Sequence, residues 1–225
     1  MNKYLFPIYA VIIGFIIVKI TKNKPVKNIK LLLAFSGAFL LSLTIFDLLP
    51  EVYEHIQSRA IGLCIMAGIL LQIILEFFSK GAEHGHVHVH EKRSAFPWLL
   101  FISLCLHAFL EGFPIHQHND MVYGVLIHKI PIAILIITYL FQSGFKNGQV
   151  LFFLVLFTIM TPLGTIISNN VDMVAGYIDY INAIVIGIFL HISTTILFES
   201  SEGHKFNLSK ILVIVAAVGI AYFMH

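Results

Sequence analysis

Long apolar stretches alternate with short polar segments along the whole sequence. Eight stretches are dominated by Leu, Ile, Val and Phe, at residues 4–20, 31–50, 61–78, 96–118, 121–141, 150–167, 177–198 and 208–224. A helix needs about 20 apolar residues to cross the ~30 Å hydrocarbon core of a bilayer. The apolar residues run continuously and do not alternate with polar ones, which favours helices over the strands of a membrane barrel. The pattern predicts an all-α membrane protein with eight transmembrane helices.

The amino-acid composition supports a membrane protein. Of the 225 residues, 58% are hydrophobic and 12% are charged, whereas about 25% of the residues in a soluble domain are charged. We expect residues 1–225 to form a single transmembrane domain in contact with the lipid bilayer. The net charge of +2 is too small to indicate a nucleic-acid partner. The sequence leaves the oligomeric state open, with a homodimer among the alternatives.

The basic residues are distributed unequally between the two sides of the predicted bundle. Eleven of the 14 lysines and arginines lie near the connections that follow the first, third, fifth and seventh helices. Cytoplasmic loops of membrane proteins carry an excess of Lys and Arg. The distribution predicts a multi-pass protein of the cell membrane (plasma or inner membrane), with both termini outside and the lysine-rich loops in the cytosol.

Two short segments hint at an internal repeat. Residues 37–40 read Gly-Ala-Phe-Leu and residues 187–190 read Gly-Ile-Phe-Leu, and each lies in an apolar stretch that ends at a glutamate. The predicted topology places them in helices two and seven, which run in opposite directions. Related segments of opposite orientation are typical of inverted-repeat transporters. We therefore predict an inverted repeat of helices one to three and six to eight around helices four and five.

Ionisable side chains occur within two adjacent apolar stretches. His107 and Glu111 are four residues apart, so they project from one face of a helix about one turn apart. The next stretch contains His128 and Lys129, followed by Pro131. Because proline removes a backbone donor, we expect Pro131 to break its helix locally.

These four ionisable residues favour a functional polar site. An ionised side chain at mid-membrane costs ~3 kcal/mol or more, so such residues need partners and a polar interior. A lone histidine or glutamate can be a hydrogen-bonded packing residue, but four such groups on two neighbouring helices are difficult to explain by packing. Two imidazoles with one carboxylate are a ligand set suited to zinc and tolerant of iron, cobalt or nickel.

Four short segments resemble motifs of the ZIP (Zrt/Irt-like) metal transporter family, in the family's order. Residues 107–112 read His-Ala-Phe-Leu-Glu-Gly, where the family's fourth helix reads His-Asn-x-x-Glu-Gly. Residues 128–133 read His-Lys-Ile-Pro-Ile-Ala, where its fifth helix reads His-Glu-x-Pro-x-Glu. Residues 47–51 (Asp-Leu-Leu-Pro-Glu) and 161–164 (Thr-Pro-Leu-Gly) are similar to the His-Leu-Leu-Pro-Glu of its second helix and the Pro-Leu-Gly of its sixth.

The resemblance implies a transporter that moves zinc, or a similar divalent metal such as iron or manganese, toward the cytosol. The metal ion, Zn²⁺ in the first place, is then the transported substrate. It passes a site between helices two, four, five and seven. His107, Glu111 and His128 correspond to metal ligands of that site.

The sequence departs from the family's pattern where many members bind a second metal. Lys129, Ile132 and Ala133 occupy the positions of acidic or histidine bridging ligands. The resemblance therefore implies a single metal, with the ammonium of Lys129 supplying the positive charge that a second cation would bring. Asp47 is either the partner of Lys129 or an additional ligand.

Further candidate ligands lie outside this group. His191 lies within the seventh apolar stretch and is a candidate for lining the metal's path. Residues 79–95 form a predicted His-rich cytosolic loop. Its imidazoles recur at every second position, so they point to one side of an extended chain and form a tract typical of metal binding: His84, His86, His88 and His90.

Two other functions remain open at this point. A membrane sensor would bind metal without transport, and it would explain both the missing bridging carboxylates and the His-rich loop. An intramembrane metal-dependent hydrolase would need three ligands and an activated water. The sequence lacks the His-Glu-x-x-His pattern of many such enzymes, so we expect a protein that is not an enzyme.

Deletion of residues 83–91 is predicted to lower the amount of zinc bound per protein while leaving transport largely intact. The imidazoles of this segment bind metal only when neutral. Wild-type protein should therefore release this zinc at about pH 5, below the unperturbed His pKa of ~6.5. Elemental analysis of the purified protein at neutral pH measures the difference. An unchanged zinc content would contradict a binding role for the loop.

Overall fold

We describe a computed structural model of the chain, in which residues 4–24, 26, 28–55, 58–79, 96–116, 120–199 and 207–224 are placed well enough to describe. Within these residues all regular structure is helical, which confirms the all-α prediction. Helices occupy each of the eight predicted apolar stretches: α1 (Phe6–Ile20), α2 (Ile29–Leu43) with α3 (Leu49–His55), α4 (Ser58–Ser79), α5 (Trp98–Leu110), α6 (Met121–Gln142), α7 (Asn147–Asn170), α9 (Ile178–Glu199) and α10 (Leu208–Met224).

The apolar helices fall into two length classes. Five are long and apolar enough to cross a membrane by length and composition: Ile29–Glu54, Arg59–Ser79, Met121–Gln142, Asn147–Asn170 and Ile178–Phe198. The helices α1, α5 and α10 are shorter, between 10 and 17 residues. The described residues therefore give an all-helical protein with five candidate membrane spans, and the count of eight stays a prediction.

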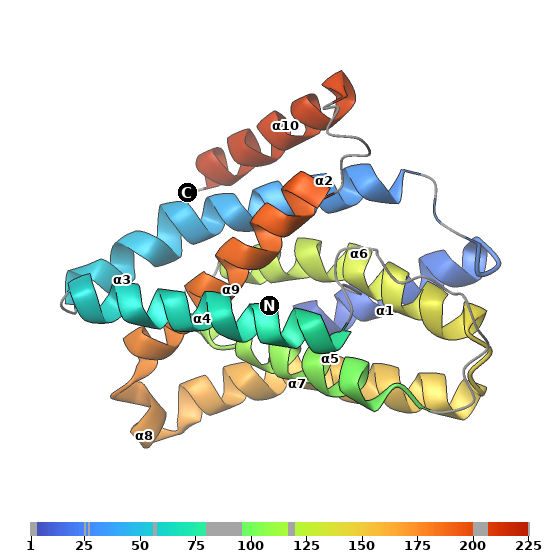
Figure 1. Cartoon of the computed structure of the whole chain (residues 1–225), viewed down its shortest axis with the longest axis horizontal. Helices are drawn as coiled ribbons and strands as arrows, with labels where there is room; N and C mark the ends of the chain where they lie inside the picture. Colours follow the sequence, from blue (N-terminus) through green and yellow to red (C-terminus); the bar gives the residue numbers. More distant parts are fainter. Residues whose placement is uncertain are drawn as a thin grey trace.

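The helices pack as pairs that extend across the molecule (Figure 1). α10 lies beside α2 at one edge, and α7 lies beside α5 at the opposite edge. Between them, α4 packs across α9, and α1 packs along α6. The four-residue helix α8 (Asp172–Ala175) connects α7 to α9.

Two separate apolar cores fill the bundle. The first is built mainly by α2, α9 and α10 and the second by α1, α5 and α7. α6 is shared between them: Met121, Val122 and Val125 belong to the first core, whereas most of the buried residues after Pro131 belong to the second, namely Ile132, Ala133, Ile134, Ile136, Ile137, Tyr139 and Leu140. The intervening turn of α6 carries the ionisable residues, so the predicted polar site lies at the junction of the two cores.

Two helix crossings depend on facing glycines. Gly68 of α4 meets Gly187 of α9, and a Cβ atom at Gly68 would lie 1.9 Å from the carbonyl oxygen of Ile184. Gly112, just after α5, meets Gly164 of α7 in the same way. Small residues allow helix backbones to approach closely in membranes, where packing rather than the hydrophobic effect drives helix association. These glycines therefore fix where the two pairs of helices touch.

The second apolar stretch contains an irregularity that the sequence analysis did not predict. α2 and α3 are joined by a π-helical segment, Thr44–Leu48, in which the amide of Leu49 donates to the carbonyl of Thr44. Pro50 lies two residues after this segment, and a proline ring crowds the carbonyl one turn earlier. A wider turn before Pro50 relieves this crowding. Segments of this kind are frequent at functional sites, and this one contains Asp47.

Two predictions about local structure were wrong. Pro131 does not break its helix, because α6 continues from Met121 to Gln142 with Pro131 inside. A membrane helix can contain a proline when neighbouring helices pack around the backbone groups that lose their hydrogen bonds. The helices α1, α2 and α7 all pack on α6. The helix predicted for the stretch 96–118 is α5, which ends at Leu110 and does not continue to residue 118. Gly112 and Pro114 both disfavour its continuation.

Replacing Gly68 by Ala is predicted to destabilise the protein, because the new methyl group would overlap the backbone of α9. Overpacking of this kind costs about 1 to 3 kcal/mol. Gly62 on the same helix has open space around it, so Gly62→Ala is the matched control and should leave stability unchanged or slightly raised. Thermal unfolding in detergent measures both variants. Equal melting temperatures would contradict the close crossing of α4 and α9.

Candidate functional site

The end of α5 is fixed by hydroxyl groups of α7. Glu111 forms the C-terminal cap of α5, and its amide donates to the carbonyl of His107. The next two carbonyls, of Gly112 and Phe113, accept hydrogen bonds from Thr165 (2.8 Å) and Ser168 (3.1 Å). Carbonyls at a helix end have no partner within the helix. The α7 hydroxyls therefore complete this helix end and hold Glu111 in place between α5 and α7.

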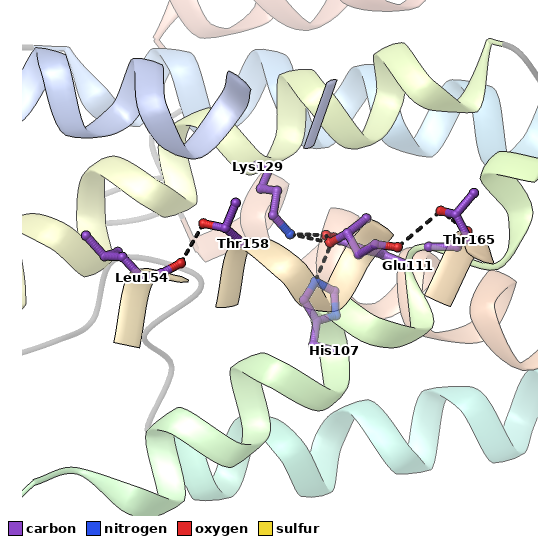
Figure 2. A network of polar contacts seen from close by, with 8 residues as sticks. His107, Glu111, Lys129, Leu154, Thr158 and Thr165 are labelled. Carbon is purple, nitrogen blue, oxygen red and sulfur yellow. Dashed lines mark hydrogen bonds and ion pairs between the residues drawn. The ribbon is translucent and has the colours of Figure 1, made fainter. Parts of the chain in front are cut away.

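A buried ion pair lies next to this helix end. The ammonium of Lys129, from α6, donates to the carboxylate of Glu111 and to the hydroxyl of Thr161 at 2.7 Å. Thr161, from α7, donates in turn to the same carboxylate oxygen at 2.7 Å. The three groups form a closed hydrogen-bonded triangle that joins α5, α6 and α7. Figure 2 shows Lys129 and Glu111 pointing toward each other within the bundle.

The triangle is sealed from its surroundings. The side chains of Glu111 and Lys129 are each about 2% exposed, and the ammonium lies 4.4 Å from the centre of the Phe157 ring. Burying either charge alone costs several kcal/mol, and a close opposite charge with further hydrogen bonds offsets that cost. The ring face adds a further attraction for the ammonium. The ammonium of Lys129 is therefore stabilised by the carboxylate of Glu111, the hydroxyl of Thr161 and the ring of Phe157.

Both predicted histidines adjoin the ion pair. His107 places its Nε2 atom 3.4 Å from the second carboxylate oxygen of Glu111, as their spacing on α5 predicts. His128 lies beside Lys129 on α6, and its ring centre is 6.2 Å from that of His107 at 77° between ring planes. Both imidazoles are buried. The structure thus brings His107, Glu111, His128 and Lys129 into one group, which we call the central group.

The central group does not hold a metal site in its present arrangement. Among the described residues, no three His, Cys, Asp or Glu side chains are grouped so that they could hold a metal ion. The ring separation of 6.2 Å is nevertheless suggestive, since two imidazoles on one zinc, with Zn–N bonds near 2.0 Å, have ring centres about 5 to 6 Å apart.

Asp47 lies half-buried in the π-helical segment, which packs against α9. The sequence left it as the partner of Lys129 or as a further ligand. The hydrogen bonds of the Lys129 ammonium go to Glu111 and Thr161, so Glu111 is its ion-pair partner. A ligand role for Asp47 stays a prediction. The histidines of the loop, at positions 84, 86, 88 and 90, lie outside the described residues.

His191 has a partner that the sequence analysis did not single out. Its Nε2 atom lies 2.7 Å from a carboxylate oxygen of Glu76, across the contact between α9 and α4. These side chains are 20% and 23% exposed, in contrast to the central group. The pair belongs to a different helix crossing from the central group, which lies between α5, α6 and α7.

Three residues of these polar contacts were missed as functional candidates. Thr161 was noted only within the Thr-Pro-Leu-Gly segment, and Phe157 and Glu76 were not singled out. Glu76 carried a usable signal, because it is the one acidic residue between positions 61 and 78. Phe157 carried none, since it is one of 18 phenylalanines that are spread through the apolar stretches.

Comparison with known proteins gives a partial match. No family model matches the sequence. The zinc transporter ZIP1 of Danio rerio is 33% identical to this chain over 88 residues, which cover 36% of this chain and 29% of that protein. The chain thus matches less than a third of the relative's length. The match and the apolar helices together fit a multi-pass membrane protein concerned with metal-ion transport.

Proposed function

We propose that this chain is a ZIP-type transporter that moves zinc, or a similar divalent metal such as iron or manganese, toward the cytosol. The observation that carries the proposal is the 88-residue match to a zinc transporter. The buried polar group within an apolar bundle supports it, because ionisable residues inside membrane helices mark substrate pathways. The proposed location is the cell membrane, with both termini outside.

His107, Glu111 and His128 are the proposed ligands of the transported ion. They are the metal-binding residue types of the central group, and they come from α6 and from the end of α5. Zinc is commonly bound by three such groups with a fourth position open. An ion in transit needs this open position, because it must leave the site again.

Lys129 determines what metal entry requires. A divalent cation with two neutral imidazoles and one carboxylate carries a net charge of +1, and an adjacent ammonium raises the local charge to +2. Two like charges a few ångströms apart repel by some kcal/mol even at an effective dielectric near ~20. The cation therefore has to displace the ammonium from Glu111 or cause it to lose its proton. If metal binding releases the proton of Lys129, a higher pH favours the bound state, so zinc affinity should rise with pH.

The packing of the helices supports the proposed inverted repeat. An inverted repeat would exchange α1, α2 and α4 with α7, α9 and α10, and α5 with α6. This exchange converts the α1–α6 contact into the α7–α5 contact, and the structure has both. The same exchange converts the α2–α10 contact into the α9–α4 contact. The α2–α6 and α4–α5 contacts have no equally extensive α9–α5 and α10–α6 counterparts in the described part of the chain. The repeat that we propose is therefore approximate, with α5 and α6 between its halves.

Uptake of radioactive zinc into proteoliposomes separates the proposed transporter from the other two functions. A transporter moves metal with no substrate added, whereas a sensor retains it and a hydrolase requires a substrate to act. Orientation of the protein in the vesicles, determined by protease accessibility of the lysine-rich loops, gives the direction of movement. Zinc binding without uptake in either orientation would contradict the proposed function.

Replacement of His107 or Glu111 by Ala is predicted to abolish zinc uptake. Each change removes one ligand from a site with three, and two protein ligands hold zinc much more weakly. Thr158→Val is the matched control, because its hydroxyl bonds only the carbonyl of Leu154 in its own helix. Uptake in proteoliposomes measures all three variants, with size-exclusion profiles to verify folding. Wild-type uptake in a folded His107→Ala, Glu111→Ala double variant would contradict the site.

Replacement of Lys129 by Met is predicted to destabilise the zinc-free protein and to tighten zinc binding. Loss of one partner of a buried ion pair costs about 3 to 5 kcal/mol, and a cation at Glu111 would then restore the missing positive charge. The thermal shift caused by zinc should therefore be larger than in wild-type protein. Lys129→Glu should tighten binding further and admit a second zinc ion, because it adds a carboxylate ligand.

Titration calorimetry measures affinity and stoichiometry in these Lys129 variants. The exposed Lys24 provides the control variant Lys24→Met, which should behave as wild type. Unchanged or weaker zinc affinity in both Lys129 variants would show that the ammonium does not compete with the metal.

A further inference from the structure

The seam between α4 and α9 contains a second polar pair. Glu76 and His191 meet at 2.7 Å between Oε2 and Nε2. A carboxylate and an imidazole are the ligand types from which zinc sites are built. Gln72 lies one turn before Glu76 on α4, and its side chain is fully buried. The pair is therefore extended by a further polar side chain on the same helix face.

The glycine crossing places these residues on facing helix surfaces. Gly68, Gln72 and Glu76 follow one another at intervals of four along α4, and Gly187 and His191 do so along α9. Residues four apart lie on one face of a helix. Because Gly68 and Gly187 touch, the polar residues beyond them also face the partner helix. The pair is thus a fixed feature of this crossing and not a chance contact of long side chains.

The partial exposure of the pair is informative. Both side chains keep a fifth or more of their surface accessible, while the central group is sealed. Exposure of an ionised carboxylate to hydrocarbon is costly, so ionisable residues in membrane helices face a protein interior or a water-filled cavity. The exposed surface of Glu76 and His191 is therefore expected to face water or polar headgroups, which a hydrated cation can reach.

The pair also has a defined place along the bundle axis. α4 ends at Ser79 and α5 begins at Trp98, and the two packed helices border the segment that carries the four loop histidines. At 1.5 Å per residue, Glu76 lies roughly 5 Å from that end of α4, whereas His107 lies roughly 14 Å from the corresponding end of α5. Glu76, and with it His191, therefore lies nearer than His107 to the end of the bundle where α4 ends and α5 begins.

We infer that Glu76 and His191 form a second, low-affinity binding site for a divalent cation, on the path between the central group and the end of the bundle where α4 ends and α5 begins. The inference rests on the proposed function, since it assigns this pair a place on the same route. Two protein ligands, completed by water, give weak binding and fast release. A site of this kind suits an ion that has left the central group.

Equilibrium dialysis with radioactive zinc tests the inference in protein that lacks residues 83–91, so that the loop histidines do not contribute. We expect two saturable sites of different affinity. His191→Asn should remove only the weaker site, because the amide keeps the hydrogen bond to Glu76 but is a poor zinc ligand. Glu76→Gln should do the same. Thr194→Val, whose hydroxyl bonds carbonyls of its own helix, is the control and should keep both sites.

A cysteine at position 191 separates a ligand from a packing residue. His191→Cys should keep the weaker site and shift its preference toward Cd²⁺ by about tenfold or more, since thiolates favour soft metals. Two saturable sites in both His191→Asn and Glu76→Gln, or a cysteine variant without the weaker site, would overturn the inference. A single site that His107→Ala removes would also overturn it while leaving the proposed function intact. Retention of both sites in His107→Ala would instead contradict the central group.

Discussion

The ion pair between Lys129 and Glu111 is the interaction on which the interior of this protein depends. It joins α5, α6 and α7 through atoms that are almost completely withdrawn from solvent. Such a pair contributes little net stability compared with apolar residues of the same size, but loss of one partner leaves a buried charge. The apolar cores on either side can therefore vary in detail, whereas this pair tolerates change only when its charges remain balanced.

The approach of the helices is set by residues with almost no side chain. Gly68, Gly112, Gly164 and Gly187 allow backbone contacts that any larger residue would prevent. Close contact brings the hydroxyls of Thr165 and Ser168 to the carbonyls at the end of α5. The position of Glu111 thus depends on the contact between Gly112 and Gly164. The polar site therefore cannot be separated from the packing of the helices.

The sequence predicted the helices and the central group because both can be read from short segments of the chain. Continuous apolar stretches located each of the long helices, and the four-residue spacing of His107 and Glu111 placed them on one face. The missed features depend on tertiary contacts. Whether Pro131 breaks its helix is decided by the neighbours of α6, and the pairing of Glu76 with His191 is decided by where α4 crosses α9. Neither can be read from the intervals between residues in a single sequence.

The shared position of α6 has a mechanical consequence. Under the proposed transport function the protein would open alternately to two sides, and the two apolar cores are the bodies that would move relative to each other. Packed cores resist deformation, so displacement concentrates where they meet. α6 crosses that boundary at His128 and Lys129. Relative movement of the cores would therefore separate Lys129 from Glu111. An ion that replaced Lys129 as the partner of Glu111 would change the free-energy cost of this movement.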